Sequence, residues 1–297
     1  METYNQIIKQ MEQQRIRISE QQREEIAKIY RDAAKNLGRN LSSRWSKSAN
    51  VYYVIDYARE LKEQSRYIYQ DVLAAIQSGV SNTARAVTSA QVQYWSHVSP
   101  ALMDRLRDHM SSIPQSVVDE ILSGGLYHDG KGLSQRVWRA CNQYERDIDY
   151  IINAGIIERK SAYDLAKDLE AYVLPDAKKP FDWSKIYPRC NKVVDYNAQR
   201  LARTACTHAY QMSFQRATRD NPFVESYQWH SSNSSRVCPL CRSRDGKIFA
   251  KDSVPLDHPN GMCIITAVIS KSYDEIADEI AAWINGGSNP ALDAWLS

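Results

Sequence analysis

Apolar residues recur at helical spacing along most of the first two-thirds of the chain. Residues 51–77 and 192–219 carry them at steps of three and four, with polar and charged residues between. Because an α-helix has about 3.6 residues per turn, this spacing gathers the apolar side chains on one face. The same kind of pattern occupies residues 4–37, 100–110, 114–122, 133–153 and 161–173. The pattern predicts a mainly α protein with long amphipathic helices in its N-terminal two-thirds.

Glycines and prolines mark the predicted ends of these helices. Gly38 is predicted to end the first helix and Gly79 the second, since glycine favours helix ends over helix interiors. Pro100 and Pro114 are each predicted to open a helix, because proline fits the first helical turn. The densest turn signal, in residues 123–132, predicts a surface loop.

Beyond Pro222 the pattern changes to short β-type runs, at residues 225–229, 247–249 and 264–269. Ser, Asn and Gly residues separate these runs. A last helix is predicted for residues 272–284, because its first residues have the form of a capping box. This part of the chain is expected to form a small α+β module.

The charge balance limits the classes of partner. The chain has 38 Lys and Arg against 35 Asp and Glu, a formal net charge of +3, which is too small for a dedicated nucleic-acid-binding protein. One local segment, between Asp32 and Asp56, contains no acid and combines basic with aromatic side chains, a pairing that can hold phosphates and stack bases. A polar connector between helices is the alternative interpretation. The candidate DNA contacts are Lys35, Arg39, Arg44, Trp45 and Lys47.

The cysteines suggest a metal site. The N-terminus has neither the basic nor the apolar region of a signal peptide, and no window of about 18 uncharged apolar residues occurs, so we expect neither export nor a membrane span. Three of the six cysteines lie between positions 238 and 263. In a chain without an export signal, such a cluster favours a metal over disulfides.

The clustered residues have the spacing of a zinc knuckle. Cys238 and Cys241 form a Cys-Pro-Leu-Cys turn, and His258 and Cys263 follow on a presumed hairpin. Zinc binds four thiolate or imidazole donors in a tetrahedron, typically with one pair from a tight turn. We therefore predict a structural Zn²⁺ held by these four side chains. Because four protein donors leave no open coordination position, the ion is expected to stabilise the fold and not to catalyse.

Other interpretations of this cluster remain open at this point. The Cys-x-x-Cys turn could be a redox dithiol or an unmetallated turn with buried thiols, and the metal could be catalytic. A metal-dependent HNH-like nuclease would use His258 as its general base, but no histidine follows it and Asn285 lies where the last helix ends. A zinc-ribbon DNA-binding protein is the third alternative.

Motifs for other catalytic classes are absent from the sequence, which has no GxxxxGK[ST], GxSxG, HExxH or strand-associated GxGxxG. Cys206 and His208 are two positions apart on a predicted helix and point in different directions, so we expect a core cysteine and a surface histidine. Asp147 and Asp149 are expected on a solvated helix face. We predict that the protein is not an enzyme.

Residues 200–204, 227–229, 235–241, 245–249 and 258–260 contain, in this order, Arg-Leu-Ala-Arg-Thr, Tyr-Gln-Trp, Ser-Arg-Val-Cys-Pro-Leu-Cys, Asp-Gly-Lys-Ile-Phe and His-Pro-Asn. These motifs resemble those of the minor head, or head-morphogenesis, proteins of tailed bacteriophages, the group similar to protein F of phage Mu. That group has an Arg-Thr-Glu helix, a strand with Trp, a Cys-Pro-x-Cys knuckle, an Asp-Gly-Lys-x-Phe strand and a His-Pro closure. Ala205 stands where the group has Glu, and the final His-Pro-x-Cys-Arg-Cys becomes His-Pro-Asn-Gly-Met-Cys with one cysteine fewer. The matching segments are 200–204, 227–229, 235–241, 245–249 and 258–260, and residues 132–138 and 161–169 resemble the minor capsid branch.

The resemblance covers about residues 132–269 and implies a structural virion protein, present in few copies. It implies association with the phage portal protein or the major capsid protein, and a role in head assembly, DNA packaging or DNA ejection. Packaged DNA would be a further, non-specific partner, and the expected location is the virion, or the host cytoplasm during assembly, without a membrane contact. The expected organisation is a helical region that contacts portal or capsid (1–190), a C-terminal module with the zinc-knuckle hairpin (191–285) and a flexible tail (286–297).

Overall fold

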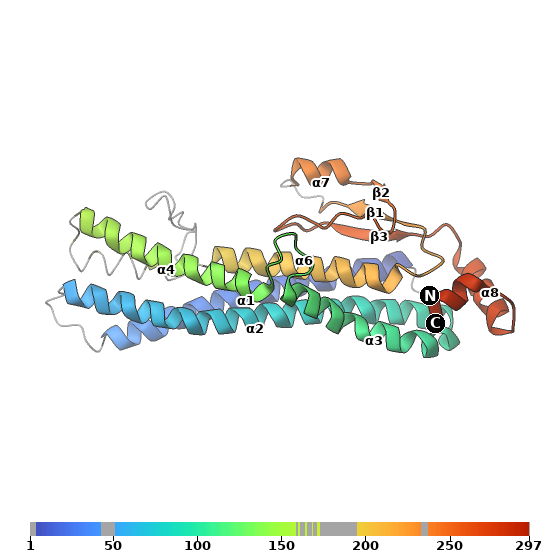
Figure 1. Cartoon of the computed structure of the whole chain (residues 1–297), viewed down its shortest axis with the longest axis horizontal. Helices are drawn as coiled ribbons and strands as arrows, with labels where there is room; N and C mark the ends of the chain where they lie inside the picture. Colours follow the sequence, from blue (N-terminus) through green and yellow to red (C-terminus); the bar gives the residue numbers. More distant parts are fainter. Residues whose placement is uncertain are drawn as a thin grey trace. The chain divides into compact units, whose positions relative to one another are not determined.

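The structure is a computed structural model that describes residues 4–42, 51–158, 160, 164, 168, 171–172, 195–232 and 237–296. Within these ranges, the side chains of 34–42, 51–58, 61, 156 and 196 are not described. The described residues are mainly helical, with a small antiparallel sheet of three strands towards the C-terminus (Figure 1). This confirms the predicted fold class.

The longest helices are longer than their local sequence signals indicate. Among the described residues, the long helices are α1 (Tyr4–Ser42), α2 (Val51–Val98), α3 (Pro100–Ser123), α4 (Leu133–Ile157) and α6 (Tyr196–Thr218). The predicted helix ends at Gly38 and Gly79 are both wrong, because α1 continues to Ser42 and α2 continues to Val98. The apolar side chains on either side of Gly79, Ile76 and Val80, are both fully buried. Their burial outweighs the cost of about 1 kcal/mol for a glycine inside a helix.

Pro114 does not open a separate helix either, because it lies inside α3. A proline in a helix interior costs about 3 kcal/mol through its missing N–H and the clash of its ring. The apolar stripe of α3 continues across it, with Ile113, Val117 and Ile121 all buried. Burial of this stripe joins the two predicted helices, residues 100–110 and 114–122, into one continuous helix.

The chain divides into two compact units, each built from segments that are distant in the sequence. One unit contains residues 1–19, 78–122 and 203–297, and the other contains residues 20–77 and 123–202. This division differs from the predicted boundary at residue 190. A helix rises about 1.5 Å per residue, so helices as long as α1 and α2 can contribute to more than one core.

The core of the unit of residues 20–77 and 123–202 lies among α1, α2 and α4. Its aromatic rings include Tyr30 against Tyr144, with ring centroids 6.0 Å apart, and Tyr144 against Tyr172 at 6.4 Å. The Tyr172 hydroxyl donates to Asp147 Oδ2 at 2.6 Å. Asp147 is 1% exposed, so the expectation of a solvated carboxylate there is wrong. The buried apolar side chains of this core include Ile26, Ile68, Val72, Ile76, Val137, Ile148 and Ile151.

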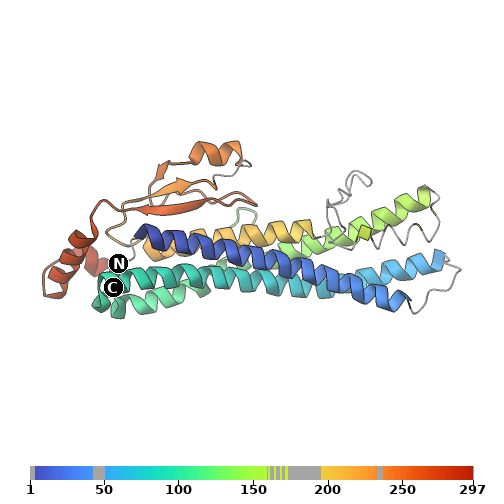
Figure 2. The ribbon, with the colours of Figure 1, turned by 180° about the vertical axis from the view of Figure 1, so that it is seen from behind.

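The sheet belongs to the other unit. Its strands are β1 (Ser226–His230), β2 (Ile248–Phe249) and β3 (Ile264–Val268), in the order β2-β1-β3. β2 and β3 lie within predicted β-type runs, and β1 extends one residue beyond its predicted run of 225–229. Side chains alternate across β1, so Tyr227 and Trp229 point to the same face and both are buried. They join a core with apolar residues of α1, α2 and α6, and both ribbon views show α6 beneath the sheet (Figures 1 and 2).

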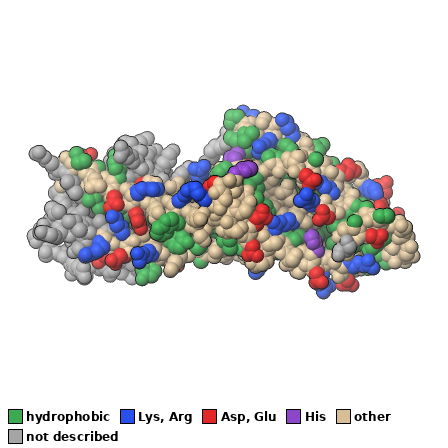
Figure 3. Space-filling model, viewed as in Figure 1, with side chains coloured by type: hydrophobic (Ala, Val, Ile, Leu, Met, Phe, Trp, Pro, Cys, Tyr) green, Lys and Arg blue, Asp and Glu red, His purple; other side chains and the backbone are tan. Residues whose placement is uncertain are grey.

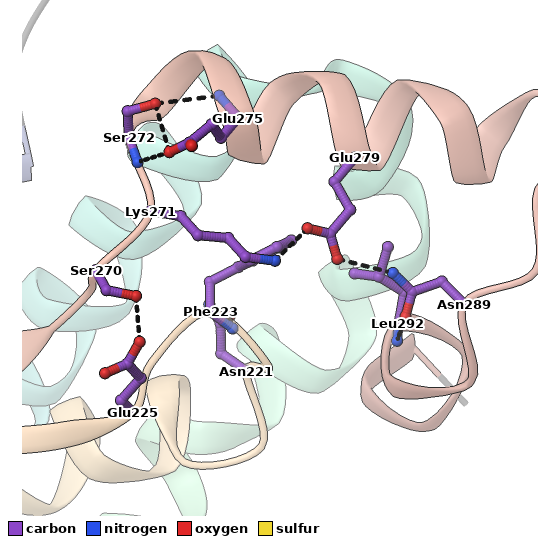
Figure 4. Close-up of polar contacts among 10 residues, drawn as sticks. All are labelled: Asn221, Phe223, Glu225, Ser270, Lys271, Ser272, Glu275, Glu279, Asn289 and Leu292. Atoms are coloured by element: carbon purple, nitrogen blue, oxygen red, sulfur yellow. Dashed lines mark hydrogen bonds and ion pairs between the residues drawn. The ribbon is translucent and has the colours of Figure 1, made fainter.

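Two short helices end the chain, α8 (Tyr273–Ile284) and α9 (Pro290–Leu296). The predicted capping box is confirmed: the Ser272 hydroxyl accepts the N–H of Glu275, whose carboxylate accepts the N–H of Ser272 (Figure 4). In the same view, Glu279 accepts from Lys271 and from Asn289 Nδ2. These contacts tie the segment before α8 and the start of α9 to the middle of α8.

The tail of residues 286–297, expected to be flexible, contains a packed helix. Trp295 of α9 is 8% exposed and lies against Trp95, with ring centroids 5.2 Å apart, and against Phe223 at 6.4 Å. Leu292 is fully buried. Burial of these two apolar side chains orders a segment whose Gly, Asn and Pro content favours a loop.

The surface of the described residues carries mixed charge. On the face drawn in Figure 3, basic and acidic side chains are interspersed. None of the described helices combines the length and the apolar character that a membrane crossing requires.

Candidate metal centre

The Cys-x-x-Cys turn opens the short helix α7 (Pro239–Arg244). Cys238 is the N-cap, and its Sγ accepts the backbone N–H of Cys241 at 3.3 Å. Pro239 occupies the first turn, where its fixed φ favours helical backbone and its missing N–H is not needed. The local sequence thus folds the turn so that both sulfurs lie on one side of it.

The structure brings the four predicted donor residues into one cluster. The donor atoms of Cys238, Cys241 and His258 all lie within 4.8 Å of one another, and Cys238 Sγ is 3.3 Å from His258 Nε2. A second group, within the same limit, contains Cys241, Asp257 and Cys263. Cys241 belongs to both groups and links them, so the four predicted donors and one carboxylate form one continuous cluster. This cluster could hold a metal ion.

Asp257 is the donor that the sequence interpretation did not assign to the metal. Its side chain is 3% exposed, and each oxygen already accepts a backbone N–H: Oδ1 that of His258 at 2.8 Å and Oδ2 that of Cys263 at 3.1 Å. The carboxylate therefore orients the two residues that supply the second pair of donors. The candidate donors of the cluster are therefore three sulfurs, one imidazole and this hydrogen-bonded carboxylate.

The His258 ring is oriented as a metal ligand requires. Its Nδ1 lies 3.0 Å from the Pro259 carbonyl oxygen and donates to it, and Nε2 is directed at Cys238 Sγ. The proton is assigned here from the hydrogen-bond partner. A donor bond from the other ring nitrogen is the usual way in which proteins fix the tautomer of a metal-binding histidine.

The acid–base properties of the cluster differ between its exposed and buried members. The backbone N–H of Cys241, and then His258, lower the pKa of Cys238. Burial raises the pKa values of Cys241 and Cys263, and the hydrogen bond to Pro259 raises that of His258. Burial therefore opposes the charge of two of the thiolates, and a divalent cation would offset that cost when it displaces their protons.

One face of α6 holds the loop that carries Asp257 and His258. Gln211 accepts the Asp257 N–H at 3.1 Å and His208 Nε2 donates to the Asp257 carbonyl at 2.9 Å. Thr207 donates to the Gly261 carbonyl at 3.0 Å, and one turn earlier Thr204 accepts the N–H of Asn260 at 2.8 Å. Residues three and four positions apart share a helix face, so these side chains form one polar row.

This polar row was missed in the sequence, and His208 was assigned to the surface. That assignment is wrong, because His208 is 3% exposed. Cys206 is buried in the core, as expected. One signal in the sequence could have identified the row: polar side chains repeat at steps of three and four on an otherwise apolar helix. Such a repeat indicates a buried helix face that packs against polar groups.

The loop that follows His258 makes a tight turn beneath the cluster. The N–H of Gly261 donates to the His258 carbonyl at 2.9 Å, and Asn260 has a φ of 66°, in the left-handed region. A Cβ on Gly261 would lie 2.1 Å from Asp257 Oδ2. Only glycine fits at this position, because any side chain would displace the carboxylate that orients His258 and Cys263.

Lys35, Arg39, Arg44, Trp45 and Lys47, the candidate DNA contacts, lie outside the residues whose side chains are described. Among the described residues, the two groups that share Cys241 are the candidate metal clusters. No family model, no curated protein and no solved structure matches this chain.

Proposed function

We propose that this chain is a structural minor head protein of a tailed bacteriophage, with its C-terminal module held together by one zinc ion. The observation that carries the structural role is the cluster of candidate donors, in which Cys241 links Cys238 and His258 on one side to Cys263 on the other. The phage context is supported by the motif resemblance of residues 132–269. In this proposal the protein acts at the portal vertex or the inner capsid, in head assembly, DNA packaging or DNA ejection.

The donor chemistry supports zinc. Three thiolates and one imidazole match the sulfur and nitrogen preference of Zn²⁺, and four protein donors fill its tetrahedron. The strands of the sheet have five, two and five residues. Such a small sheet buries little apolar surface of its own, whereas structural zinc can supply roughly 10 kcal/mol of apparent folding free energy in isolated knuckles.

The nuclease alternative finds less support at His258. A general base needs a nitrogen that can take a proton from the nucleophile. One nitrogen of His258 is engaged with the Pro259 carbonyl and the other faces Cys238 Sγ at 3.3 Å. The DNA-binding alternative would require a basic surface, and the face drawn in Figure 3 mixes both signs of charge.

Elemental analysis of freshly purified protein tests the metal. We expect about one zinc per chain, and we expect Cys238→Ser to lose it. Cys141→Ser is the matched control, because Cys141 is a buried free cysteine outside the cluster and its loss should leave the zinc content unchanged. Purified protein that contains no zinc and takes none up would exclude the proposed centre.

Binding to a portal oligomer tests the biological role. We expect the full chain to co-sediment with the portal protein encoded in the same genome and to be present in purified virions. A chain found only as a free monomer, and never in virions, would contradict the role. Nicking of a plasmid with Mg²⁺ that is lost in His258→Ala would instead favour the nuclease.

A further inference from the structure

Arg15 of α1 is a buried charge beside the loop of residues 257–263, called the metal loop below. It is 1% exposed, and its guanidinium donates from Nη1 to Thr207 Oγ1 at 3.2 Å and from Nη2 to the Met262 carbonyl at 3.2 Å. The group also lies over the ring of Tyr210, 5.5 Å from its centroid. Its Nε is buried without a hydrogen-bond partner.

All of these partners are uncharged. The salt bridges among the described residues include none to Arg15. The acid closest to it along α1, Glu12, is half-buried one turn earlier and is near the same Tyr210 ring, but the ion pairs of the described residues include none between Glu12 and Arg15. A charge removed from water is strongly unfavourable unless an opposite charge lies nearby. The position of Arg15 therefore requires a compensating negative charge within the same unit.

The metal loop can supply that charge. Met262, which accepts from Arg15, directly precedes Cys263, and Thr207, the other acceptor, donates to the carbonyl of Gly261. Gly261 in turn lies beside the Asp257 carboxylate, which a Cβ on this glycine would meet at 2.1 Å. A divalent cation with three thiolates and one neutral imidazole carries a net negative charge, and Asp257 adds another.

We propose that Arg15 is the buried counterion of the metal centre, and that it couples the packing of residues 4–19 of α1 to metal binding. This inference rests on the proposed zinc site. Metal binding and helix packing then stabilise each other, because a coupling free energy acts equally in both directions. Arg15 is a positioning residue for the loop and does not bind the ion.

Hydrogen exchange on the wild-type protein tests the coupling without a substitution. We expect removal of zinc by a chelator to increase exchange both in residues 237–265 and in residues 4–19 of α1. Residues 133–157 of α4, which belong to the other compact unit, serve as the internal control and should not change. Unchanged exchange of residues 4–19 after verified zinc loss would overturn the coupling.

Zinc affinity, measured by competition with a chromogenic chelator, tests the residue itself. We expect Arg15→Met to weaken binding about 10- to 100-fold, the range found when supporting contacts of a metal site are removed. Arg15→Lys keeps the charge and should lose less. The matched control is Arg17→Met, because Arg17 is an exposed arginine on the same helix and should leave the affinity unchanged.

The possible failures are distinguishable. If the wild-type chain binds no zinc, the proposed centre fails, and the inference fails with it. If the wild type binds zinc and Arg15→Met binds it with equal affinity, the counterion role is overturned while the zinc site stands. An equal loss of zinc affinity in Arg17→Met would also overturn the counterion role. The loss would then follow from a change in the net charge of the protein and not from the removal of a buried guanidinium beside the metal loop.

Discussion

The two compact units of this chain are stabilised by different kinds of interaction. In the unit of residues 20–77 and 123–202, long helices bury apolar stripes, with Ile26, Val72 and Ile148 all fully buried. In the other unit, the sheet also contacts a cluster of polar donors, where Asp257 and His258 are held by hydrogen bonds from α6 and from the loop itself. Apolar burial tolerates many side chains, whereas the donor cluster requires particular residues at particular positions.

Loss of the metal is expected to produce the largest difference in stability between the two units. Cys238→Ser removes one of the thiolates, so the ion should be lost together with up to roughly 10 kcal/mol of apparent folding free energy. We expect the region after Pro222 to lose its structure, while α4 keeps its protection. Hydrogen exchange read by mass spectrometry, with zinc content measured in parallel, would show this. Equal loss of protection in both units would remove the contrast between them.

A cavity in the helical core is expected to destabilise the unit of residues 20–77 and 123–202 and to leave the metal content unchanged. Ile148 of α4 is fully buried, and Ile148→Ala should destabilise its unit by about 2–5 kcal/mol through lost apolar contact and the residual cavity. Zinc content should remain at the wild-type level, since Ile148 does not belong to the unit that holds the donors. Urea denaturation followed by circular dichroism, with elemental analysis of the folded protein, measures both. Zinc loss in this variant would show that the two units depend on each other.

Within the metal loop, Gly261→Ala is expected to have an intermediate effect. The added Cβ would collide with the Asp257 carboxylate, which would then move away from the N–H groups of His258 and Cys263. We expect zinc affinity to fall about 10- to 100-fold. Gly246→Ala is a useful control outside the loop, because a Cβ on Gly246 meets no atom within 4 Å, although its φ of 72° strains any side chain. Wild-type affinity in Gly261→Ala would mean that Asp257 is not needed to position the donors.

The smallest effect is expected at the capping box of α8. Ser272→Ala removes the hydroxyl that accepts the Glu275 N–H and should cost about 1 kcal/mol. The backbone N–H of Ser272, and then its hydroxyl, lower the pKa of Glu275. Because the folded-state pKa is lowered, the carboxylate contributes stability above its ordinary pKa, and that contribution is lost as the pH falls through the lowered value. In thermal unfolding, the stability difference between the wild type and Ser272→Ala should therefore narrow at acidic pH, where the bond from the Ser272 hydroxyl to the carboxylate is lost, but should not vanish, because the bond from the Glu275 N–H does not titrate.

Local sequence signals were sufficient for the elements that short stretches of chain stabilise. The capping box of α8, the three strands and the Cys-x-x-Cys turn at α7 could all be placed from residues only a few positions apart. The four candidate donors could be selected because their residue types and spacing match the chemistry of zinc, and the structure places them in one cluster that could hold a metal ion. The mainly helical fold class followed from the apolar period.

Other features depend on contacts between residues that are distant in the sequence, and only the tertiary structure determines these contacts. Gly79 ends no helix because apolar packing on both sides of it outweighs its own preference, and Trp295 orders the last helix against Trp95. Arg15 meets Thr207 across 192 positions, and His208 meets Asp257 across 49. A single sequence records which side chains need partners, but long-range packing determines which partners they find.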